Sequence, residues 1–481
     1  MTPQNYSARI HETLLLFGAT GDLSLRYLFP SLVHLLRDRL LPTDFREVAV
    51  GRQEYDVQGF RDLLRARLGS AAARNHDAFD DLLARTEYIA VDLGDSALMG
   101  RVLSRYADRP CVSYLAIPPD LFVPTCQGLQ AAGLLAAPSQ LVLENPIGHD
   151  LASSRAINAA LRGYLDETRI FRIDHYLGKA PVQNLLALRF GNTLMEAVWH
   201  NRWIESVDIL VAETAGVDGR EGYYAQYGAL RDMVQNHMLQ LLALIAMEPP
   251  GSLDADSLRD EKRKVLSALR PMTAADVALD SVRGRYQAGV VDGHAVPGLT
   301  HASYTETFVA LRTRMDNWRW ASVPFRLVTG KRLAQRTTEV VVSFKPVSHW
   351  LFDRPPHSDA APNRLVMQLQ PDENIALGLM GSLAAPEWDG TELQPLSLDL
   401  SMAATPQRRI AYEHLMLDAL HANQTLFVTG EELEAAWSWI DSIAMLGKQR
   451  RFHRNPIPQV PGAQRKPRTS CRLRYLPPNA R

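Results

Sequence analysis

Residues 172–179 read RIDHYLGK and gather four kinds of polar side chain within six positions. The groups are a carboxylate, an imidazole, a phenol and an ammonium, contributed by Asp174, His175, Tyr176 and Lys179. The apolar residues just before them predict a buried strand, so the polar groups fall where that strand opens into a loop. Ligands of α/β proteins bind beyond the carboxyl ends of parallel strands, which makes this cluster a candidate anion site. Taken alone, the same residues also fit a solvated strand end with one hydrogen-bonded histidine.

A glycine-containing turn, GATGDLS at residues 18–24, is the second candidate site. It follows a predicted strand, Thr13–Phe17, and precedes a helix whose apolar face comprises Leu28, Leu32, Leu35 and Leu36. Gly18 and Gly21 would let the backbone approach a pyrophosphate, and the helix N-terminus would supply N–H donors. Because GxxGxxS departs from the commoner GxGxxG, an ordinary strand-to-helix turn is the alternative.

Arg52 follows the second predicted strand, where a dinucleotide fold that uses NAD usually carries an acidic residue. Its guanidinium could hold a 2′-phosphate in a bidentate fork, which favours NADP. The alternative is a plain surface arginine.

His237 flanks the apolar face of a predicted helix over residues 231–250. That face comprises Val234, Met238, Leu241, Leu242 and Ile245, and the helix is expected to stop at Pro249 and Pro250. A histidine at such a place is either a hydrogen-bonded core residue or a catalytic base.

The elements that must position these residues fall into two patterns. In the N-terminal third, short apolar runs alternate with helical segments, which predicts a parallel, Rossmann-like sheet. Its strands are expected at Thr13–Phe17, Val48–Val50, Tyr88–Val91, Val112–Ile117 and Leu141–Leu143. From about residue 200, longer alternating strands predict an α+β domain with a large, mainly antiparallel sheet. These strands include Trp203–Ala212, Thr305–Thr313, Thr338–Phe344 and Leu365–Leu369.

The composition fits a soluble globular protein of more than one domain, with 481 residues, 46% hydrophobic residues and a net charge of −1. Nothing in this balance points to nucleic acid as a partner. The three cysteines lie far apart, so we expect neither a disulfide framework nor a metal site. No signal-like or membrane-spanning apolar run occurs, and a cytoplasmic location is expected.

Several stretches together closely resemble the glucose-6-phosphate dehydrogenase family. Besides GATGDLS and RIDHYLGK they are YLAIPP (114–119), VQNLLALRF (182–190), GALRDMVQNHMLQ (228–240), AMEPP, DNWRWASVPFRLVTGKRL (316–333), NQTLF (423–427) and EAAWSWID (434–441). They run in order from the N-terminal turn to residue 441, so the resemblance covers nearly the whole chain.

This resemblance implies oxidation of glucose 6-phosphate at C1 to a lactone, the first step of the oxidative pentose phosphate pathway, with NADP, or alternatively NAD, as hydride acceptor. It implies that His237 is the base and that Asp174 orients it. His175, Tyr176 and Lys179 would bind the phosphate, Glu213 and Asp232 the sugar hydroxyls, and Lys331 and Arg336 would reach in from the GKRLAQR loop. The coenzyme would contact Gly18, Thr20, Gly21, Asp22, Leu23, Arg52 and Asn145. A homodimer or homotetramer built through the large sheet is also implied.

Three positions depart from the family pattern. Asn145 in ENPIG replaces the lysine of EKPFG, Tyr27 replaces a lysine near the coenzyme, and Ala180 replaces a glutamate, with Pro181 expected to stiffen the loop. Two classes of function therefore stay open. One is a working dehydrogenase, with altered kinetics or a different sugar phosphate, and the other is a weakened paralogue that serves as a binding or regulatory subunit.

Three segments are expected along the chain. Residues 1–175 would form the NADP-binding domain and 176–447 the α+β substrate-binding and oligomerisation domain. Residues 448–481 carry many basic and no acidic residues, which predicts a solvated, flexible tail.

Overall fold

The structure is a computed structural model that describes residues 11–72, 74–217, 221–287, 289–291, 294–296, 305–349, 351–352, 363–382, 393–400 and 409–447. The predicted basic tail lies outside the described residues. Among the described helices, none combines the length and apolar character that a membrane crossing requires.

The chain forms two compact units, each assembled from separate segments. The first unit comprises residues 1–183, 250–263 and 407–437, and the second comprises 184–249, 264–406 and 438–481. Three of the five unit boundaries fall within helices, namely α7 (Ala180–Phe190), α11 (Ala255–Ala268) and α14 (Gly430–Gly447). C-terminal residues thus belong to the same unit as the N-terminal turn.

The first unit contains a seven-stranded sheet in the order β17-β6-β5-β4-β1-β2-β3. All its pairings are parallel except that of β17 with β6, which is antiparallel. The strands are β1 Thr13–Phe17, β2 Arg46–Gly51, β3 Thr86–Ala90, β4 Cys111–Leu115, β5 Gln140–Glu144, β6 Ile170–Ile173 and β17 Phe427–Val428. The predicted parallel sheet is confirmed, and the five expected strands lie within two residues of their predicted bounds.

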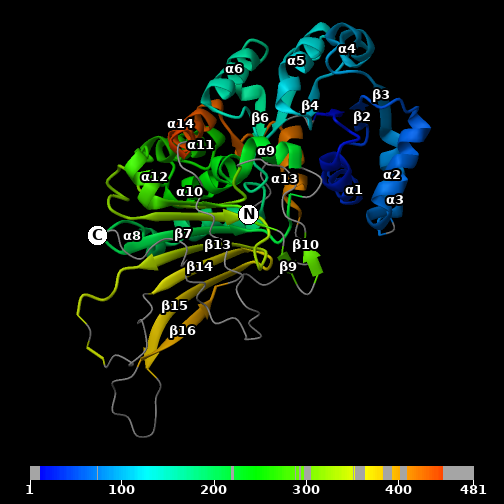
Figure 1. Ribbon diagram of the computed structural model, residues 1–481. Helices are drawn as coiled ribbons and strands as arrows, with labels where there is room; N and C mark the ends of the chain where they lie inside the picture. The colour runs from blue at the N-terminus through cyan, green and yellow to red at the C-terminus, as the bar shows by residue number, and fades with distance from the viewer. Residues whose placement is uncertain are drawn as a thin grey trace. The chain divides into compact units, whose positions relative to one another are not determined.

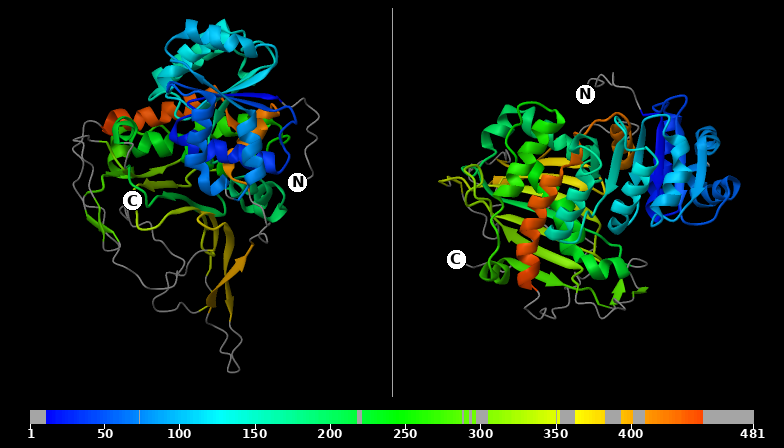
Figure 2. Two further views of the ribbon diagram at one scale, coloured as in Figure 1. Left: turned by 90° about the vertical axis from the view of Figure 1, so that its right-hand side faces the viewer. Right: turned by 90° about the horizontal axis from the view of Figure 1, so that it is seen from above.

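Helices cover both faces of this sheet (Figure 2, left), as in doubly wound α/β proteins. One layer holds α1 Phe29–Arg37, α2 Val57–Ala72 and α3 His76–Arg85, and the other holds α4 Ser96–Leu103, α5 Phe122–Ala131 and α6 Leu151–Arg162. Short helical segments are η1 Ser24–Leu28, η2 Ser104–Tyr106, η3 Pro119–Leu121 and η4 Glu167–Arg169. Helix α13, Ala411–Leu420, which comes from the C-terminal part of the chain, contacts η1 and α1.

The first helix shows how the sequence pattern produces this packing. Leu28, Leu32 and Leu35 are buried in the hydrophobic core, and Leu36 is partly buried against it, as the apolar spacing predicts. The first turn of this segment, η1, is π-helical rather than α-helical. The spacing of apolar residues does not distinguish the two over so short a stretch.

The second unit is built on an eight-stranded sheet in the order β16-β15-β14-β13-β7-β12-β11-β8. Its pairings are antiparallel except that of β12 with β7, so the predicted mainly antiparallel sheet is confirmed. Figure 1 shows β13, β14, β15 and β16 side by side. The strands are β7 Ile204–Ala212, β8 Ser281–Gly284, β11 Phe308–Thr313, β12 Phe325–Gly330, β13 Thr337–Phe344, β14 Arg364–Gln370, β15 Asn374–Ser382 and β16 Leu393–Asp399.

The remaining elements of the second unit include a short hairpin and several helices. They are β9 Gly289–Val291, β10 His294–Val296, α8 Thr193–Val198, α9 Glu221–Ala229, η5 Leu230–Met238, α10 Leu239–Ala246 and α12 Ala274–Asp280. The predicted helix over 231–250 is therefore a π-helical segment followed by an α-helix that ends at Ala246. The predicted strand from Thr305 begins instead at Phe308, and Thr305, which lies before it, donates its hydroxyl to the Ala225 carbonyl.

Candidate active site

The turn after β1 holds its shape through backbone constraints that only glycine meets at its first position. Gly18 has a φ of +78°, and a Cβ added there would lie 2.3 Å from the Ala116 carbonyl oxygen. The Gly18 carbonyl accepts from the Gly21 N–H at 2.9 Å and from the Ser24 hydroxyl at 2.9 Å. η1 begins at Ser24 with no side-chain cap, and the Leu25 N–H donates to the Gly21 carbonyl at 3.0 Å, so any N–H groups offered to an anion lie earlier in the turn.

The side chains around this turn reach the end of the neighbouring strand β2. Thr20 donates to the Gln53 side chain at 2.5 Å, which links the turn to the segment that carries the exposed Arg52. Asp22 pairs with Arg26 at 2.8 Å on the surface. Arg52 therefore lies on the segment held against the turn, as a 2′-phosphate contact requires.

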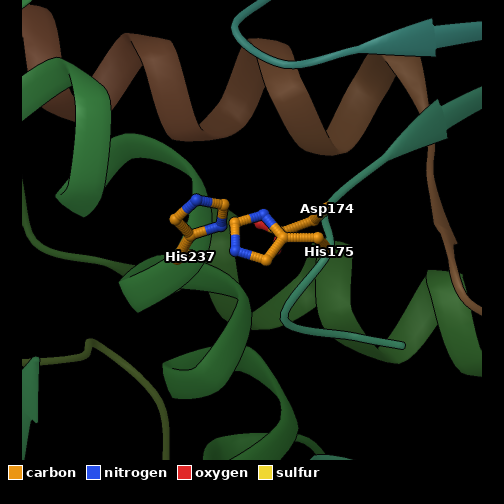
Figure 3. Close-up of side chains that lie close together, drawn as sticks. All are labelled: Asp174, His175 and His237. Atoms are coloured by element: carbon orange, nitrogen blue, oxygen red, sulfur yellow. The ribbon is translucent and has the colours of Figure 1, made fainter. Parts of the chain in front are cut away.

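The RIDHYLGK segment forms a tight turn after β6. Asp174 is fully buried, and its carboxylate accepts the Tyr176 N–H at 2.9 Å. The Asp174 carbonyl accepts the Leu177 N–H at 3.0 Å, which closes the turn. Figure 3 shows Asp174 and His175 just beyond the end of the strand. The predicted strand-end position of this cluster is confirmed.

Lys179 and the residues after it end the turn and begin α7. The Lys179 ammonium lies 3.3 Å from the centre of the Tyr176 ring, a cation–π contact that holds the side chain over the turn. Ala180 and Pro181 are the first two residues of α7. The expectation that Pro181 stiffens a loop is wrong, because proline fits the first helical turn, where its missing N–H has no intrahelical partner.

The two turns lie at one edge of the same sheet. β1, β4, β5 and β6 are mutually parallel, so their carboxyl ends face the same way. The glycine turn follows β1 and the RIDHYLGK turn follows β6. A dinucleotide at the first turn and a phosphate at the second would thus be served by one rigid scaffold.

In the second unit, three predicted substrate residues meet at the ends of two parallel strands. Glu213 follows β7 and Lys331 follows β12, and these strands pair with Ala212 opposite Gly330. Lys331 forms an ion pair with Glu213 and lies 3.8 Å from Asp232. The cluster is one cation shared by two carboxylates, and carboxylates are good acceptors for sugar hydroxyls.

Arg336, the second cation predicted from the GKRLAQR loop, follows Lys331 by five residues. It is exposed and directly precedes β13. Between the two cations, Arg332 has a φ of +55°, and its N–H donates to the Ala215 carbonyl at 3.1 Å. A left-handed arginine is strained, and such strain is common at functional loops.

His237 lies in η5, the π-helical segment, and is buried (Figure 3). The backbone N–H of His237 donates to the side-chain oxygen of Asn236 at 2.6 Å. π-Helical segments are rare in proteins, and many of those that occur lie at functional sites. Here the π-helical segment also carries Asp232. The structure therefore puts two predicted site residues on one irregular helix.

The helix that continues from η5 is fixed at its carboxyl end by three buried side chains. Arg189 donates to the Leu244 and Met247 carbonyls at 3.0 and 2.9 Å. The Trp199 and Trp320 indoles donate to the Ile245 and Ala246 carbonyls at 2.8 and 2.7 Å. The last carbonyls of a helix lack intrahelical partners, so these donors complete α10. Arg189 and Trp320 belong to the resembling stretches VQNLLALRF and DNWRW, and here they serve structure.

The comparisons with known proteins agree with this arrangement over both units. The family model for the glucose-6-phosphate dehydrogenase NAD binding domain matches residues 15–184, and the model for the C-terminal domain of the same family matches residues 186–472. The chain belongs to the glucose-6-phosphate dehydrogenase family. It is therefore a dehydrogenase of the class that acts on a CH–OH group.

Relatives and solved structures of the glucose-6-phosphate dehydrogenase family match nearly the whole chain. Glucose-6-phosphate 1-dehydrogenase of Zymomonas mobilis is 46% identical and covers 90% of this chain and 91% of its own. The Mycolicibacterium smegmatis enzyme is 45% identical with 89% of each chain covered. The Mycobacterium avium crystal structure has a TM-score of 0.80 at 34% identity, covering 93% and 94%. A glucose-6-phosphate dehydrogenase solved with glucose 6-phosphate has a TM-score of 0.79 at 31% identity, covering 91% and 92%.

Two residues that the sequence reasoning did not single out lie beside the predicted site of this glucose-6-phosphate dehydrogenase family member. Tyr114 from β4 donates to Glu144 at the end of β5 at 2.5 Å. Burial raises the pKa of Glu144 to about 7, the Tyr114 hydrogen bond lowers it, and the nearby Asp174 carboxylate raises it. Tyr114 lies in YLAIPP, a stretch that resembles the family, and Glu144 lies in ENPIG, which differs from the family's EKPFG at Asn145; these motifs were the available signal.

Asn145 follows Glu144 and fits a contact to a bound coenzyme or sugar. Its amide nitrogen and oxygen are both buried without a hydrogen-bond partner among the described residues. An unpaired buried amide costs about 1–3 kcal/mol unless a ligand or water satisfies it. The residues present therefore fit a dinucleotide, with close backbone approach at Gly18 and an open amide at Asn145.

Proposed function

We propose that this family member oxidises glucose 6-phosphate at C1 to 6-phosphoglucono-lactone with NADP as the preferred acceptor. The observation that carries the proposal is the shared edge of the first unit's sheet. The dinucleotide turn follows β1 and the turn with Asp174, His175 and Lys179 follows β6 of the same parallel sheet. The relatives named glucose-6-phosphate 1-dehydrogenase support the choice of substrate.

His237 is the proposed base, and Asp174 the residue that orients it. The imidazole takes the proton of the C1 hydroxyl, while the bound nicotinamide supplies the chemistry that accepts the hydride from C1. A carboxylate beside the imidazole would fix its tautomer and stabilise the imidazolium that forms. The burial of each side chain supports these roles, because electrostatic interactions are stronger where water is excluded.

The phosphate of the sugar is assigned to His175, Tyr176 and Lys179. Lys179 supplies a fixed positive charge, and the Tyr176 ring beneath it limits the directions in which the ammonium can point. Charge-assisted hydrogen bonds to phosphate are stronger than neutral ones, so the lysine should dominate affinity.

The sugar hydroxyls are assigned to Glu213 and Asp232, with Lys331 between them and Arg336 on the same loop. The ion pair of Lys331 with Glu213 supports this, because it holds the carboxylate in one orientation before substrate binds. Hydroxyl donors would then replace water at carboxylate oxygens that are already positioned.

The coenzyme is assigned to Gly18, Thr20, Gly21, Asp22, Leu23, Arg52 and Asn145. Arg52 supports NADP over NAD, because a guanidinium pairs with the 2′-phosphate and a ribose 2′-hydroxyl offers no charge. NAD is the weaker alternative.

We also infer a homo-oligomer in the cytoplasm. The buried cysteines Cys111 and Cys126 are free thiols, which suits a reducing compartment. The edge strand β16 exposes Leu396 and Leu398, which supports association through the large sheet.

The test follows the absorbance of reduced nicotinamide with glucose 6-phosphate and either coenzyme. The wild-type chain should turn over with NADP, and His237→Asn should lower kcat by about 10²–10⁴-fold while KM changes little. His149→Asn, at an exposed position, is the matched control. Inactivity of the wild type and of Asn145→Lys at high enzyme concentration would contradict the proposal and favour a binding subunit.

A further inference from the structure

Tyr27 lies directly after the coenzyme turn and presents its ring to another aromatic residue. It belongs to η1, and its side chain is 46% exposed. The ring centroid lies 5.6 Å from that of Tyr412, with the planes tilted by 35°. This separation is within the range at which aromatic pairs attract each other.

Tyr412 also lies against His175 in the RIDHYLGK turn. It stands in the first turn of α13 and is buried. Its ring centroid lies 6.0 Å from that of His175, with the planes only 13° apart. A single ring thus touches one residue from the coenzyme turn and one from the phosphate turn, all within the first unit.

Contacts on two sides hold α13, the helix that carries Tyr412, in place. Movement of this helix therefore contributes little to the position of the Tyr412 ring. Glu413 is buried and contacts the His34 imidazole at 2.6 Å, which ties α13 to α1. Arg409 pairs with Asp38 at 2.9 Å. On the other side, a Cβ added at Gly178 would lie 2.7 Å from the Ala411 carbonyl oxygen, so α13 packs directly on the RIDHYLGK turn.

We propose that Tyr27 is a positioning residue for His175, acting through the ring of Tyr412. With α13 clamped, the orientation of Tyr412 depends on what lies against its ring. Tyr27 covers one part of that ring and so limits the orientations that His175 can adopt. The inference rests on the proposed assignment of His175 to the phosphate, and it adds a residue from the coenzyme side that governs phosphate affinity.

The experiment measures sugar-phosphate binding in the full chain without coenzyme, by calorimetric titration with glucose 6-phosphate and with inorganic phosphate. Tyr27→Ala should raise both dissociation constants by about 2- to 10-fold, the range expected for loss of one aromatic pair. Tyr27→Phe keeps the ring and should bind like the wild type. Tyr55→Ala removes an exposed tyrosine that contacts Tyr88 instead, and is the matched control.

A double-mutant cycle identifies the route. In a Tyr412→Leu background, Tyr27→Ala should add no further loss, because the ring that transmits the effect is gone. Unchanged phosphate binding by Tyr27→Ala, with only the KM for NADP raised, would overturn the inference and make Tyr27 a coenzyme contact. A fully additive cycle would overturn it as well. His175→Ala separates the assumptions, since an unchanged phosphate affinity there would refute the phosphate assignment itself.

Discussion

At the scale of single residues, Asn145 is the departure with the clearest structural consequence. Its amide is buried with both polar atoms unpaired among the described residues. A lysine at the same place would bring a positive charge to the carboxyl end of β5, next to Glu144. Because preorganised charges at a reaction centre contribute strongly to turnover, this position should limit the rate.

Asn145→Lys should therefore raise kcat/KM for glucose 6-phosphate, on the order of 10-fold or more. The measurement is steady-state kinetics with NADP as acceptor. Asn145→Met carries an unbranched side chain one atom shorter than lysine and without its charge, and it should give no gain. Equal gains from both variants would show that side-chain length, and not charge, is what Asn145 lacks.

Glu47 gives a prediction about pH that is independent of the active site. It lies in β2 with no exposed surface, and burial raises its pKa from 4.5 to about 8. Between these values the unfolded chain has released the proton that the folded chain keeps, so the free energy of unfolding falls as pH rises. The slope is roughly 1.4 kcal/mol per pH unit, and it ends above about pH 8.

Glu47→Gln should remove this slope. Between pH 5 and pH 8 the free energy of unfolding of the wild type should fall, while that of the variant should stay constant with respect to this group. The measurement is the urea unfolding midpoint of each protein at pH 5 and at pH 8. Glu54→Gln, at an exposed position, should change neither midpoint. A wild type with the same pH dependence as Glu47→Gln would mean that the carboxyl is ionised in the fold.

At the scale of elements, the carboxyl end of α10 connects distant motifs with the helix that carries His237. Arg189 is buried, donates to two carbonyls and pairs with Glu196 at 3.4 Å. Its guanidinium also lies 5.3 Å from the centre of the Trp199 ring. Removing it would leave Leu244, Met247 and Glu196 without this donor.

Arg189→Met should lower the free energy of unfolding by about 2–5 kcal/mol, since buried acceptors and one charge lose their partner. Thermal unfolding midpoints and kcat should fall together, because η5 continues directly into α10. Arg202→Met, an exposed arginine, is the control. A stable but inactive variant would instead point to a direct part for Arg189 in the reaction.

At the scale of the whole molecule, the edge of the second unit's sheet should decide assembly. β16 is the last strand of eight, and Leu396 and Leu398 on it are 48% and 40% exposed. Residues two apart on a strand share a face, so these two exposed leucines lie on the same face of the edge strand. Exposed apolar edge strands pair with other chains unless they are covered.

Leu396→Lys with Leu398→Lys should shift the protein to a smaller species in light scattering coupled to size-exclusion chromatography. Leu253→Lys changes a leucine outside the sheet that is even more exposed, and it should leave the mass unchanged. If the double variant keeps the wild-type mass, the proposed assembly through this edge is wrong.

The sequence by itself determined the features that depend on neighbours in the chain. The turn at Gly18 and the polar cluster after β6 were predictable, because alternating apolar runs and glycine positions encode strand, turn and helix locally. The π-helical form of η5 was not, since nine residues with an apolar face fit either helix type.

Only the tertiary structure decided which distant segments meet. The pairing of β17 with β6 and the packing of Tyr412 on His175 join residues separated by about half of the chain. The contacts of Arg189 and Trp320 with the end of α10 span 58 and 74 residues, which is also beyond the reach of a local pattern. Such contacts follow from the burial of apolar faces in a common core, which constrains the partners of a residue without leaving a periodic signal around it. Local motifs therefore predict the residues proposed to carry the chemistry of this dehydrogenase family member. Long-range packing determines where the side chains of those residues lie.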